Sequence, residues 1–240
     1  MIGPVAGGDD IRELLSAERL TLFAQPVCDV ATGAVAFEEL LLRIRRSDGA
    51  LTGPRGVLDE AERTGTVTEI DRWVLGEAIG LAAGGRALSV NVSARSLNDG
   101  GFSARIEELL SSRDVDPSLL TFEITETALM SDLIQAARFA DRLEAQGCRF
   151  ALDDFGTGYA ALTYLKHLPV SYLKIDISFI RDLITDPRSH AVVAGIVALA
   201  GGFGVQTVAE GVSDGEILEV LKGLGVDLAQ GFFIGRPSPA

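Results

Sequence analysis

The chain alternates between short runs of β-forming residues and longer segments with helical periodicity. Such alternation predicts parallel strands joined by crossover helices. The first two predicted strands are close together and can pair antiparallel through Thr32-Gly33. Strands are expected at residues 21–27, 34–43, 88–93, 119–125, 149–153, 172–176, 205–210 and 228–232, and helices at 57–62, 70–83, 103–110, 132–146, 162–167, 190–201 and 214–224. Gly147, Gly201 and Gly225 stand where three of these helices are expected to end.

The length and composition favour one domain. The 240 residues are 47% hydrophobic, which is enough for a sizeable core, and α/β barrels of about 250 residues run as a single domain. No linker or low-complexity stretch divides the chain. We therefore expect residues 1–18 to form an N-terminal extension or first helix and residues 19–240 to form the domain. The first residues show no secretory signal, and the longest apolar run, 191–200, is too short to span a membrane, so a cytoplasmic location is expected.

Charge and cysteine content exclude several function classes. The net charge of −13 argues against binding to polymeric nucleic acid, which needs clustered Lys and Arg. A small phosphorylated ligand held through metal ions remains open. Cys28 and Cys148 lie far apart, so the sequence supports neither a disulfide framework nor a zinc site.

Two adjacent carboxylates, Asp153 and Asp154, close the apolar run at 150–152 and are followed by the glycine-rich turn Phe155-Gly156-Thr157-Gly158. An ionised carboxylate in an apolar setting loses hydration, and this loss must be compensated. Divalent cations are the usual compensation, and hard cations such as Mg²⁺ prefer oxygen ligands. The pair therefore raises the question of whether other strands bring ligands to the same place.

Polar side chains end six successive predicted strands, whereas the strand bodies are apolar. In α/β barrels, functional groups gather at the carboxyl ends of the strands. Each residue alone is more often a helix cap, a solvated group or half of an ion pair, but the joint pattern indicates a site. An empty cluster of these carboxylates would repel itself, and metals or protonation would relieve the repulsion. The residues are Glu39 and Arg43, Asn91, Glu123 with Glu126, Asp153 with Asp154, Lys174 with Asp176, and Glu210.

Other catalytic motifs are missing from the sequence. It contains no G-x-x-x-x-G-K-[ST] phosphate loop. His167 and His190 are the only histidines, and His167 falls in a helical segment, so histidine-based catalysis has little support.

Together these segments resemble the EAL-type phosphodiesterases that hydrolyse cyclic di-GMP. The resemblance runs from about Leu22 to Pro237. It implies a modified TIM-type (β/α)8 barrel with one antiparallel strand. The motifs that carry it are Gln25-Pro26, Glu39-Leu40-Leu41-Leu42-Arg43, Asn91-Val92-Ser93-Ala94-Arg95, Glu123-Ile124-Thr125-Glu126, Asp153-Asp154-Phe155-Gly156-Thr157-Gly158-Tyr159, Leu173-Lys174-Ile175-Asp176, Ala209-Glu210-Gly211-Val212, and Gln230-Gly231-Phe232-Phe233 with Arg236-Pro237.

The resemblance also implies a role for each matching residue. Glu39, Asn91, Glu123 and Asp153 would hold one Mg²⁺ or Mn²⁺ ion, and Asp153 would bridge to a second ion shared with Asp154. Lys174 would orient the attacking water, and Glu210 would complete the metal and water network. Arg43 would meet a phosphate oxygen, and the remaining substrate-binding residues would be Gln25, Leu41, Asp176 and Gln230. Glu126 would anchor the loop from Asp153 to Leu162. A homodimer and the linear product 5′-pGpG are also expected.

Three departures from the family pattern accompany these matches, and one of them is Ile44, which replaces a frequent aromatic residue. Leu40 stands where the family usually has Ala, and strand alternation points it away from Glu39, toward the packing helices. Ser213 stands where a second glutamate often follows Glu-Gly-Val, which puts some support for the Glu210 loop in doubt.

Two other functions compete with a phosphodiesterase. A barrel that senses cyclic di-GMP or docks a partner without turnover would keep the fold, although loss of Glu39 or Lys174 would then be expected. A glycosidase also uses paired carboxylates on a barrel. The adjacent Asp153-Asp154 pair and the aromatic content of only 6% argue against a sugar site.

Overall fold

The computed structural model describes residue 14, residues 18–157, 165–166 and 168–240. Most of the expected N-terminal extension, the helix expected at 162–167 and much of the loop expected to rest on Glu126 lie outside these residues.

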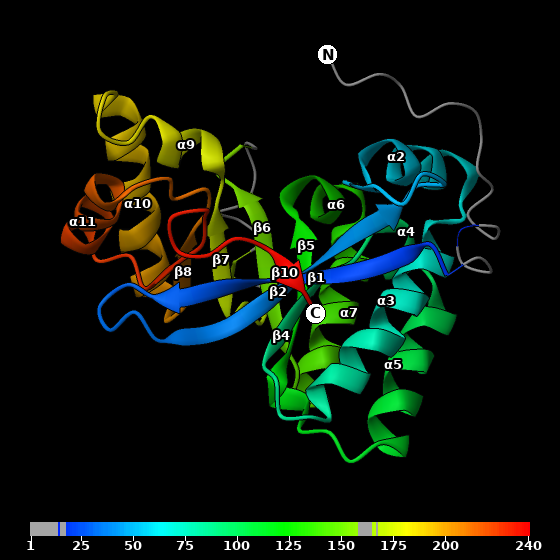
Figure 1. Ribbon diagram of the computed structural model, residues 1–240. Coiled ribbons are helices and arrows are strands. Elements are labelled where there is room, and N and C mark those ends of the chain that lie inside the picture. Colours follow the sequence, from blue (N-terminus) through cyan, green and yellow to red (C-terminus); the bar gives the residue numbers. More distant parts are fainter. Residues whose placement is uncertain (1–13, 15–17, 158–164, 167) are drawn as a thin grey trace.

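Within the described residues, eight strands close into a barrel (Figure 1). The first strand is antiparallel to both of its neighbours, and the others run parallel to one another. This arrangement confirms the predicted α/β barrel with one antiparallel strand and its opening hairpin. The barrel strands are β1 (Leu20–Asp29), β2 (Val35–Arg45), β4 (Leu88–Asn91), β5 (Leu120–Thr125), β6 (Arg149–Phe155), β7 (Tyr172–Ile175), β8 (Gln206–Ala209) and β9 (Leu228–Ala229).

Helices flank the barrel on opposite sides, with α9, α10 and α11 on one side and α3, α5 and α7 on the other (Figure 1). Two short strands, β3 (Leu51–Thr52) and β10 (Ser238–Pro239), extend the sheet beside β2 and β1. None of the described helices is both long and apolar enough to cross a membrane. The helices are α2 (Arg55–Thr64), α3 (Val67–Ala82), α4 (Ala94–Leu97), α5 (Gly100–Ser112), the 3-10 turn η1 (Pro117–Leu119), α6 (Glu126–Ser131), α7 (Leu133–Ala145), α9 (Ile177–Arg181), α10 (Pro187–Phe203) and α11 (Gly215–Leu224).

Three short helices, α4, α6 and α9, were not predicted, and each begins just after a barrel strand. Their first N–H groups are satisfied by a side chain at the helix start: Ser93 accepts from Ser96 N, Thr125 from Ala128 N, and Asp176 from Ser178 N. Helices this short have no measurable periodicity, and local capping hydrogen bonds define them instead.

One predicted helix end is wrong. Gly201 was expected to end a helix, but α10 continues to Phe203, and Gly204 takes the left-handed conformation with φ 69°. The N–H of Gly204 bonds to the carbonyls of Ala200 and Gly201, which closes the last turn. A glycine inside a helix costs only about 1 kcal/mol, so Gly201 does not stop the helix.

The barrel strands separate two apolar regions. The outer one fills the space between strands and helices, and Leu40 is buried there, as its place on the strand predicted. The inner one, which we call the basal layer, lies inside the barrel and includes Phe37 and Tyr172, whose ring centroids are 5.0 Å apart. The full basal layer is Val27, Phe37, Ala151, Tyr172, Val208 and Leu228. On each of these strands, the inward-facing side chain two residues beyond the basal layer is polar. This step runs toward the carboxyl end of every strand except β1, which is antiparallel to its neighbours.

Two loops at the carboxyl end of the barrel pack backbone against backbone. Val212 N donates to Gln230 O at 2.9 Å, and a Cβ atom added to Gly231 would lie 2.2 Å from Val212 O and 2.3 Å from Val212 N. These atoms belong to the main chain and cannot rotate away. Only glycine allows this approach, which holds the segments that carry Glu210 and Gln230 together.

We therefore expect Gly231→Ala to lower the free energy of unfolding by more than about 3 kcal/mol, because it forces these two loops apart. Urea denaturation followed by circular dichroism measures the change. Gly223→Ala is the control, since Gly223 lies in α11 with no atom within 4 Å of an added Cβ, and alanine there should raise stability by up to about 1 kcal/mol. Equal stability of the two variants would contradict the close approach.

Candidate active site

A single lysine lies among four carboxylates above the basal layer. Lys174 Nζ lies 2.6 Å from Glu123 Oε2, 2.8 Å from Glu210 Oε1, 3.2 Å from Asp153 Oδ1 and 3.5 Å from Glu39 Oε2. Only 1% of the lysine side chain is exposed. The carboxylates come from β2, β5 and β6 and from the residue after β8, so the structure brings together side chains from distant parts of the sequence.

Amide side chains hold Glu39 from two directions. Asn91 Nδ2 donates to Glu39 Oε1 at 2.8 Å, and Gln230 Nε2 donates to Glu39 Oε2 at 2.7 Å. Gln25 accepts a longer bond from Gln230 Nε2 at 3.4 Å and donates to Gly235 O at 3.0 Å. Burial alone would raise the pKa of Glu39, but Lys174 and the two amide donors outweigh it and lower the pKa.

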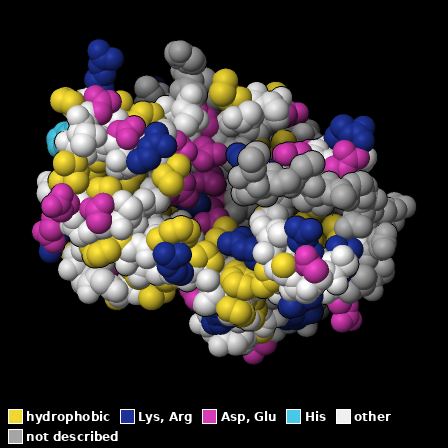
Figure 2. Space-filling model, turned by 45° about the horizontal axis from the view of Figure 1, so that its top comes forward, with side chains coloured by type: hydrophobic (Ala, Val, Ile, Leu, Met, Phe, Trp, Pro, Cys, Tyr) yellow, Lys and Arg dark blue, Asp and Glu magenta, His cyan; other side chains and the backbone are white. Residues whose placement is uncertain are grey.

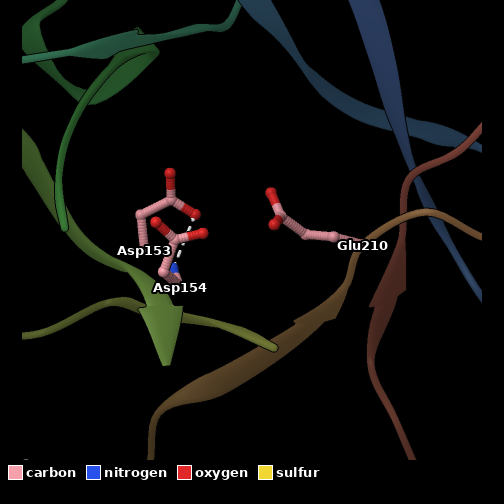
Figure 3. A group of neighbouring side chains, drawn as sticks. All are labelled: Asp153, Asp154 and Glu210. Carbon is pink, nitrogen blue, oxygen red and sulfur yellow. Dashed lines mark hydrogen bonds between the residues drawn. The ribbon is translucent and has the colours of Figure 1, made fainter. Parts of the chain in front are cut away.

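Asp153, Asp154 and Glu210 form a second group of oxygen ligands. One carboxylate oxygen from each lies within 4.8 Å of the others, and the three side chains point toward one another (Figure 3). Asp154 has a φ of 54°, which is uncommon for a residue with a Cβ, and its N–H donates to Asp153 Oδ1 at 3.0 Å. Such strain persists only where surrounding contacts hold it, and it commonly marks a functional site.

Burial and mutual repulsion raise the pKa values of several of these acids. The pKa of Glu123 rises to about 8, first because it is buried and then because Glu39 and Asp153 lie close, although Lys174 opposes the rise. Burial also raises the pKa of Glu210 to about 7. Burial and the charge of Asp153 raise the pKa of Asp154 to about 6. In the protein without metal, protons therefore share the neutralisation of the site with the lysine.

The pKa of Lys174 shifts in the opposite sense to its burial. Removal from water alone would lower it, but the carboxylates, Glu123 foremost, raise it well above the ordinary value. Lys174 is therefore an ammonium group at neutral pH. It is also the cation that the described residues place at the centre of the ring of acids.

Glu126 lies where the loop after β6 begins. It is buried at the first position of α6, and its Oε2 accepts from Gly156 N at 3.3 Å. The contact is consistent with the expected anchor, and residues 158–162 of that loop lie outside the described residues. Asp176, also expected in the site, caps α9 and contacts Asp154.

Arg43 and Leu41 lie away from the lysine, farther along β2. Arg43 Cζ lies 5.6 Å from the centroid of Phe23, and its Nη1 donates to Leu42 O at 2.9 Å. Both residues line a cleft of about 320 Å³ that also includes Pro54 and Asn91. The structure thus places the expected phosphate-binding arginine beside the carboxylate ring but not within it.

A larger cleft of about 470 Å³ has Glu39 and Glu210 in its wall. Its wall includes Arg181 and Phe232, and Phe232 is 64% exposed with the guanidinium of Arg236 4.7 Å from its centroid. Sequence reasoning assigned no role to Arg181, because it lies on the unpredicted helix α9. Figure 2 shows the acidic side chains gathered in a hollow of this face, with basic side chains around it.

The donor set fits divalent cations of the hard class. All candidate ligands are carboxylate or amide oxygens, which Mg²⁺ and Mn²⁺ prefer over the imidazole and thiolate ligands typical of zinc. Among the described residues, Glu123 Oε1 is fully buried and has no hydrogen-bond partner. A buried, unpaired carboxylate oxygen is costly, and a cation would relieve that cost.

Residues 9–237 match the EAL domain family. The chain belongs to the EAL domain family. This confirms the resemblance that the motifs indicated. The match covers almost the whole EAL chain, including every strand and loop that carries an acidic residue of the site.

Curated relatives are 34–38% identical to this EAL chain over the residues that align with it. It is 38% identical over 238 residues to the bifunctional diguanylate cyclase/cyclic di-GMP phosphodiesterase MucR of Pseudomonas aeruginosa, covering 96% of the chain and 35% of MucR. It is 34% identical over 241 residues to the cyclic di-GMP phosphodiesterase PdeF of Escherichia coli, covering 98% of the chain and 32% of PdeF. The chain therefore spans about a third of the length of these relatives.

Solved structures show the same fold. The MucR phosphodiesterase in complex with c-di-GMP superposes with a TM-score of 0.91 at 38% identity and 96% coverage of both chains. The EAL domain of FimX from Pseudomonas aeruginosa, bound to c-di-GMP, gives a TM-score of 0.90 at 29% identity, covering 96% of this chain and 95% of that one.

The departures from the family pattern lie outside the ring of carboxylates. Leu40 packs in the outer apolar region. Ser213 Oγ donates to Asp214 Oδ2 at 2.9 Å at the start of α11, and Ser213 lines the larger cleft. Ser213 thus gives the Glu210 loop a short, neutral side chain at the position where the expected family pattern has a glutamate.

The raised pKa values predict how stability depends on pH when metal is absent. Glu123 and Glu210 keep protons up to about pH 8 and 7 in the folded protein, whereas the unfolded chain releases them near pH 4.5. The folded state therefore binds more protons in this window, and stability falls as pH rises from about 5 to 8. The lowered pKa of Glu39 changes the stability only at pH values below this window, and the raised pKa of Lys174 changes it only at pH values above the window.

We expect the melting temperature in EDTA to fall by about 5 °C or more between pH 5.5 and pH 8. Differential scanning calorimetry measures it. Saturating Mg²⁺ should flatten the dependence, because the cation takes the place of the protons. Glu123→Gln, which cannot ionise, should reduce the slope in EDTA. A melting temperature that stays constant or rises over this range in EDTA would show that these acids are ionised in the folded protein.

Proposed function

We propose that this EAL domain is a metal-dependent phosphodiesterase that hydrolyses cyclic di-GMP to the linear dinucleotide 5′-pGpG. The observation that carries the proposal is the ring of four carboxylates around buried Lys174 at the carboxyl end of the barrel. Membership of a family whose relatives include named cyclic di-GMP phosphodiesterases supplies the substrate.

Two groups of ligands would hold two Mg²⁺ or Mn²⁺ ions. Glu39, Asn91, Glu123 and Asp153 would hold one ion, and Asp153 with Asp154 would hold the second. Glu210 would contribute to this network from the opposite wall. Its proximity to Asp153 and Asp154 supports that role. When bound, such ions lower the pKa of water and stabilise the entering and leaving oxygens of an in-line displacement.

The chain's own residues would orient the reacting groups. Lys174 would hold the attacking water, since its ammonium group donates up to three hydrogen bonds at the centre of the ring. The water oxygen forms a bond to phosphorus as the bond from phosphorus to the 3′ oxygen breaks. The 3′ oxygen leaves as a hydroxyl after gaining a proton, and the 5′ phosphate stays on the product.

Two clefts would take the two halves of the substrate. One has Glu39 in its wall, and the other has Asn91, whose amide donates to Glu39. The 470 Å³ cleft offers the exposed ring of Phe232, a surface on which a base can stack. The 320 Å³ cleft offers Arg43 for a phosphate oxygen, with Leu41 beside it. Gln25, Gln230 and Asp176 would hold nucleotide and water between them. This layout suits a ligand with two bases and central phosphates.

The test is turnover of cyclic di-GMP by the purified protein with Mg²⁺ or Mn²⁺, followed by chromatography of the product. We expect conversion to the linear dinucleotide, and a drop of about 100-fold or more in kcat/KM for Glu39→Gln, which removes an ionic ligand. Glu38→Gln is a matched control on the same strand. Glu38 bonds to Arg86 at 2.8 Å, away from the ring, so that variant should keep full activity.

Three results would contradict this function in different ways. Tight binding of cyclic di-GMP without turnover in both metals would make the domain a sensor. Turnover that survives complete chelation would exclude the metal-dependent mechanism. Equal activity of the Glu38 and Glu39 variants would remove Glu39 from the ligand set.

The assembly is part of the same proposal. We expect a cytoplasmic homodimer, formed through the face near the loop after Asp154. Met130 on α6 and Ile134 on α7 are 47% and 65% exposed and supply apolar surface for a partner copy. Helix α6 begins at Glu126, which contacts that loop at Gly156. Light scattering measures the mass, and a monomer at micromolar concentration would contradict the dimer.

A further inference from the structure

Helix α3 places one carboxylate among its apolar residues. Asp71 is only 8% exposed, and its neighbours Ile70, Val74 and Leu75 are all part of the outer apolar region. A carboxylate in such a position is costly unless its oxygens are hydrogen-bonded. The role of this residue is therefore indicated by the groups to which it bonds.

Asp71 bonds to the turn that follows β4. Its Oδ2 accepts from Ser93 N at 3.0 Å, and its carboxylate also bonds to the side chains of Ser93 and Ser96. Ser93 caps α4 by accepting from Ser96 N at 3.2 Å, and the two serine hydroxyls are 3.2 Å apart. The carboxylate thus joins α3 to the first turn of α4 through a closed set of hydrogen bonds.

Asn91 lies two residues before Ser93, at the end of β4. Between them, Val92 N donates to Glu123 O at 2.9 Å, so the backbone on both sides of this point is held. Asn91 Nδ2 donates to Glu39 Oε1, which leaves the carbonyl oxygen of the amide outside that bond. The backbone that carries this amide continues through Val92 into the turn that Asp71 holds at Ser93.

Asp71 and Asn91 also share the walls of two clefts. Both line the 320 Å³ cleft with Arg43, and both line a neighbouring cleft of about 390 Å³ with Thr125. A change in the turn at Ser93 would therefore alter the walls of both clefts at Asn91.

We propose that Asp71 is a positioning residue that acts through Ser93 to hold the carbonyl oxygen of Asn91 toward the divalent cation. This inference rests on the proposed metal-dependent function. Groups that orient a metal ligand from outside the ligand set commonly change metal affinity by about 10–100-fold.

The experiment measures Mg²⁺ binding through the rise in melting temperature during a titration of the substrate-free protein. We expect Asp71→Ala to raise the half-saturating Mg²⁺ concentration by about tenfold or more, and we expect the same of Asn91→Ala. The double variant should be no worse than Asn91→Ala alone, because both changes act on one interaction. Asp71→Asn should stay within about threefold of the wild type, because its amide oxygen can still accept from Ser93 N.

Asp99→Ala is the matched control for a purely structural effect. Asp99 caps α5, accepts from Gly101 N at 2.9 Å and pairs with Arg72, the residue next to Asp71. Its loss should lower the melting temperature without metal and leave the half-saturating Mg²⁺ concentration unchanged. A steady-state assay of cyclic di-GMP hydrolysis gives a second readout. The Mg²⁺ concentration that gives half-maximal kcat should rise for Asp71→Ala and stay unchanged for Asp99→Ala.

The outcomes separate this inference from the proposed function. If Asp71→Ala behaves like Asp99→Ala while the wild type shows a normal Mg²⁺ shift, Asp71 only stabilises the fold and the inference is wrong. If the wild type shows no Mg²⁺ shift, the metal site and this inference are overturned together. If Mg²⁺ binds as expected but cyclic di-GMP is not hydrolysed, the proposed function is wrong and the role of Asp71 in metal binding stands.

Discussion

The contact of one buried ammonium group with four carboxylates governs the rest of this structure. A carboxylate inside a barrel needs a counter-charge, and Lys174 provides it for Glu39, Glu123, Asp153 and Glu210 at once. One positive charge cannot neutralise four negative ones, so the remainder falls to protons in the absence of metal. The same imbalance gives divalent cations a strong reason to bind, because each brings two charges to oxygens that are already in place.

Much of the fold and of the ring of acids could be predicted from the sequence. The strands were recognisable as apolar runs ending in polar residues, and the period of two residues placed Glu39 and Arg43 on one face while turning Leu40 outward. The hairpin at Thr32-Gly33 followed from the short interval between the first strands. These features depend on local sequence and on alternation, which are visible without coordinates.

The parts that sequence reasoning missed depend on contacts between distant segments. In the sequence, Asp71 cannot be distinguished from an ordinary acidic residue on the surface of a helix. The structure shows that it is buried and bonds to Ser93. Arg181 enters a cleft because α9 begins where Asp176 caps it, and capping of a five-residue helix has no periodic signal. The end of α10 was misplaced because Gly201 and Gly204 are equally able to end a helix, and the backbone hydrogen bonds choose between them.

Backbone geometry at the mouth supports the side-chain arrangement. Asp154 is held at a positive φ by its bond to the neighbouring carboxylate, and Gly231 lets the segment with Gln230 touch the segment with Glu210. The first feature fixes the carboxyl end of β6, and the second holds the segments that follow β8 and β9 together. The positions of the oxygen ligands therefore depend on the backbone of the segments after the strands as well as on the strands themselves.

The basal layer has a consequence for the order of events in a catalytic cycle. Phe37, Tyr172 and their neighbours fill the barrel beneath the lysine, so traffic of solvent and ligands to the acids is by way of the mouth. Under the proposed function, the incoming cyclic dinucleotide and the departing linear one would compete for this entrance. In the proposed reaction, the linear product would therefore act as a competitive inhibitor of its own formation.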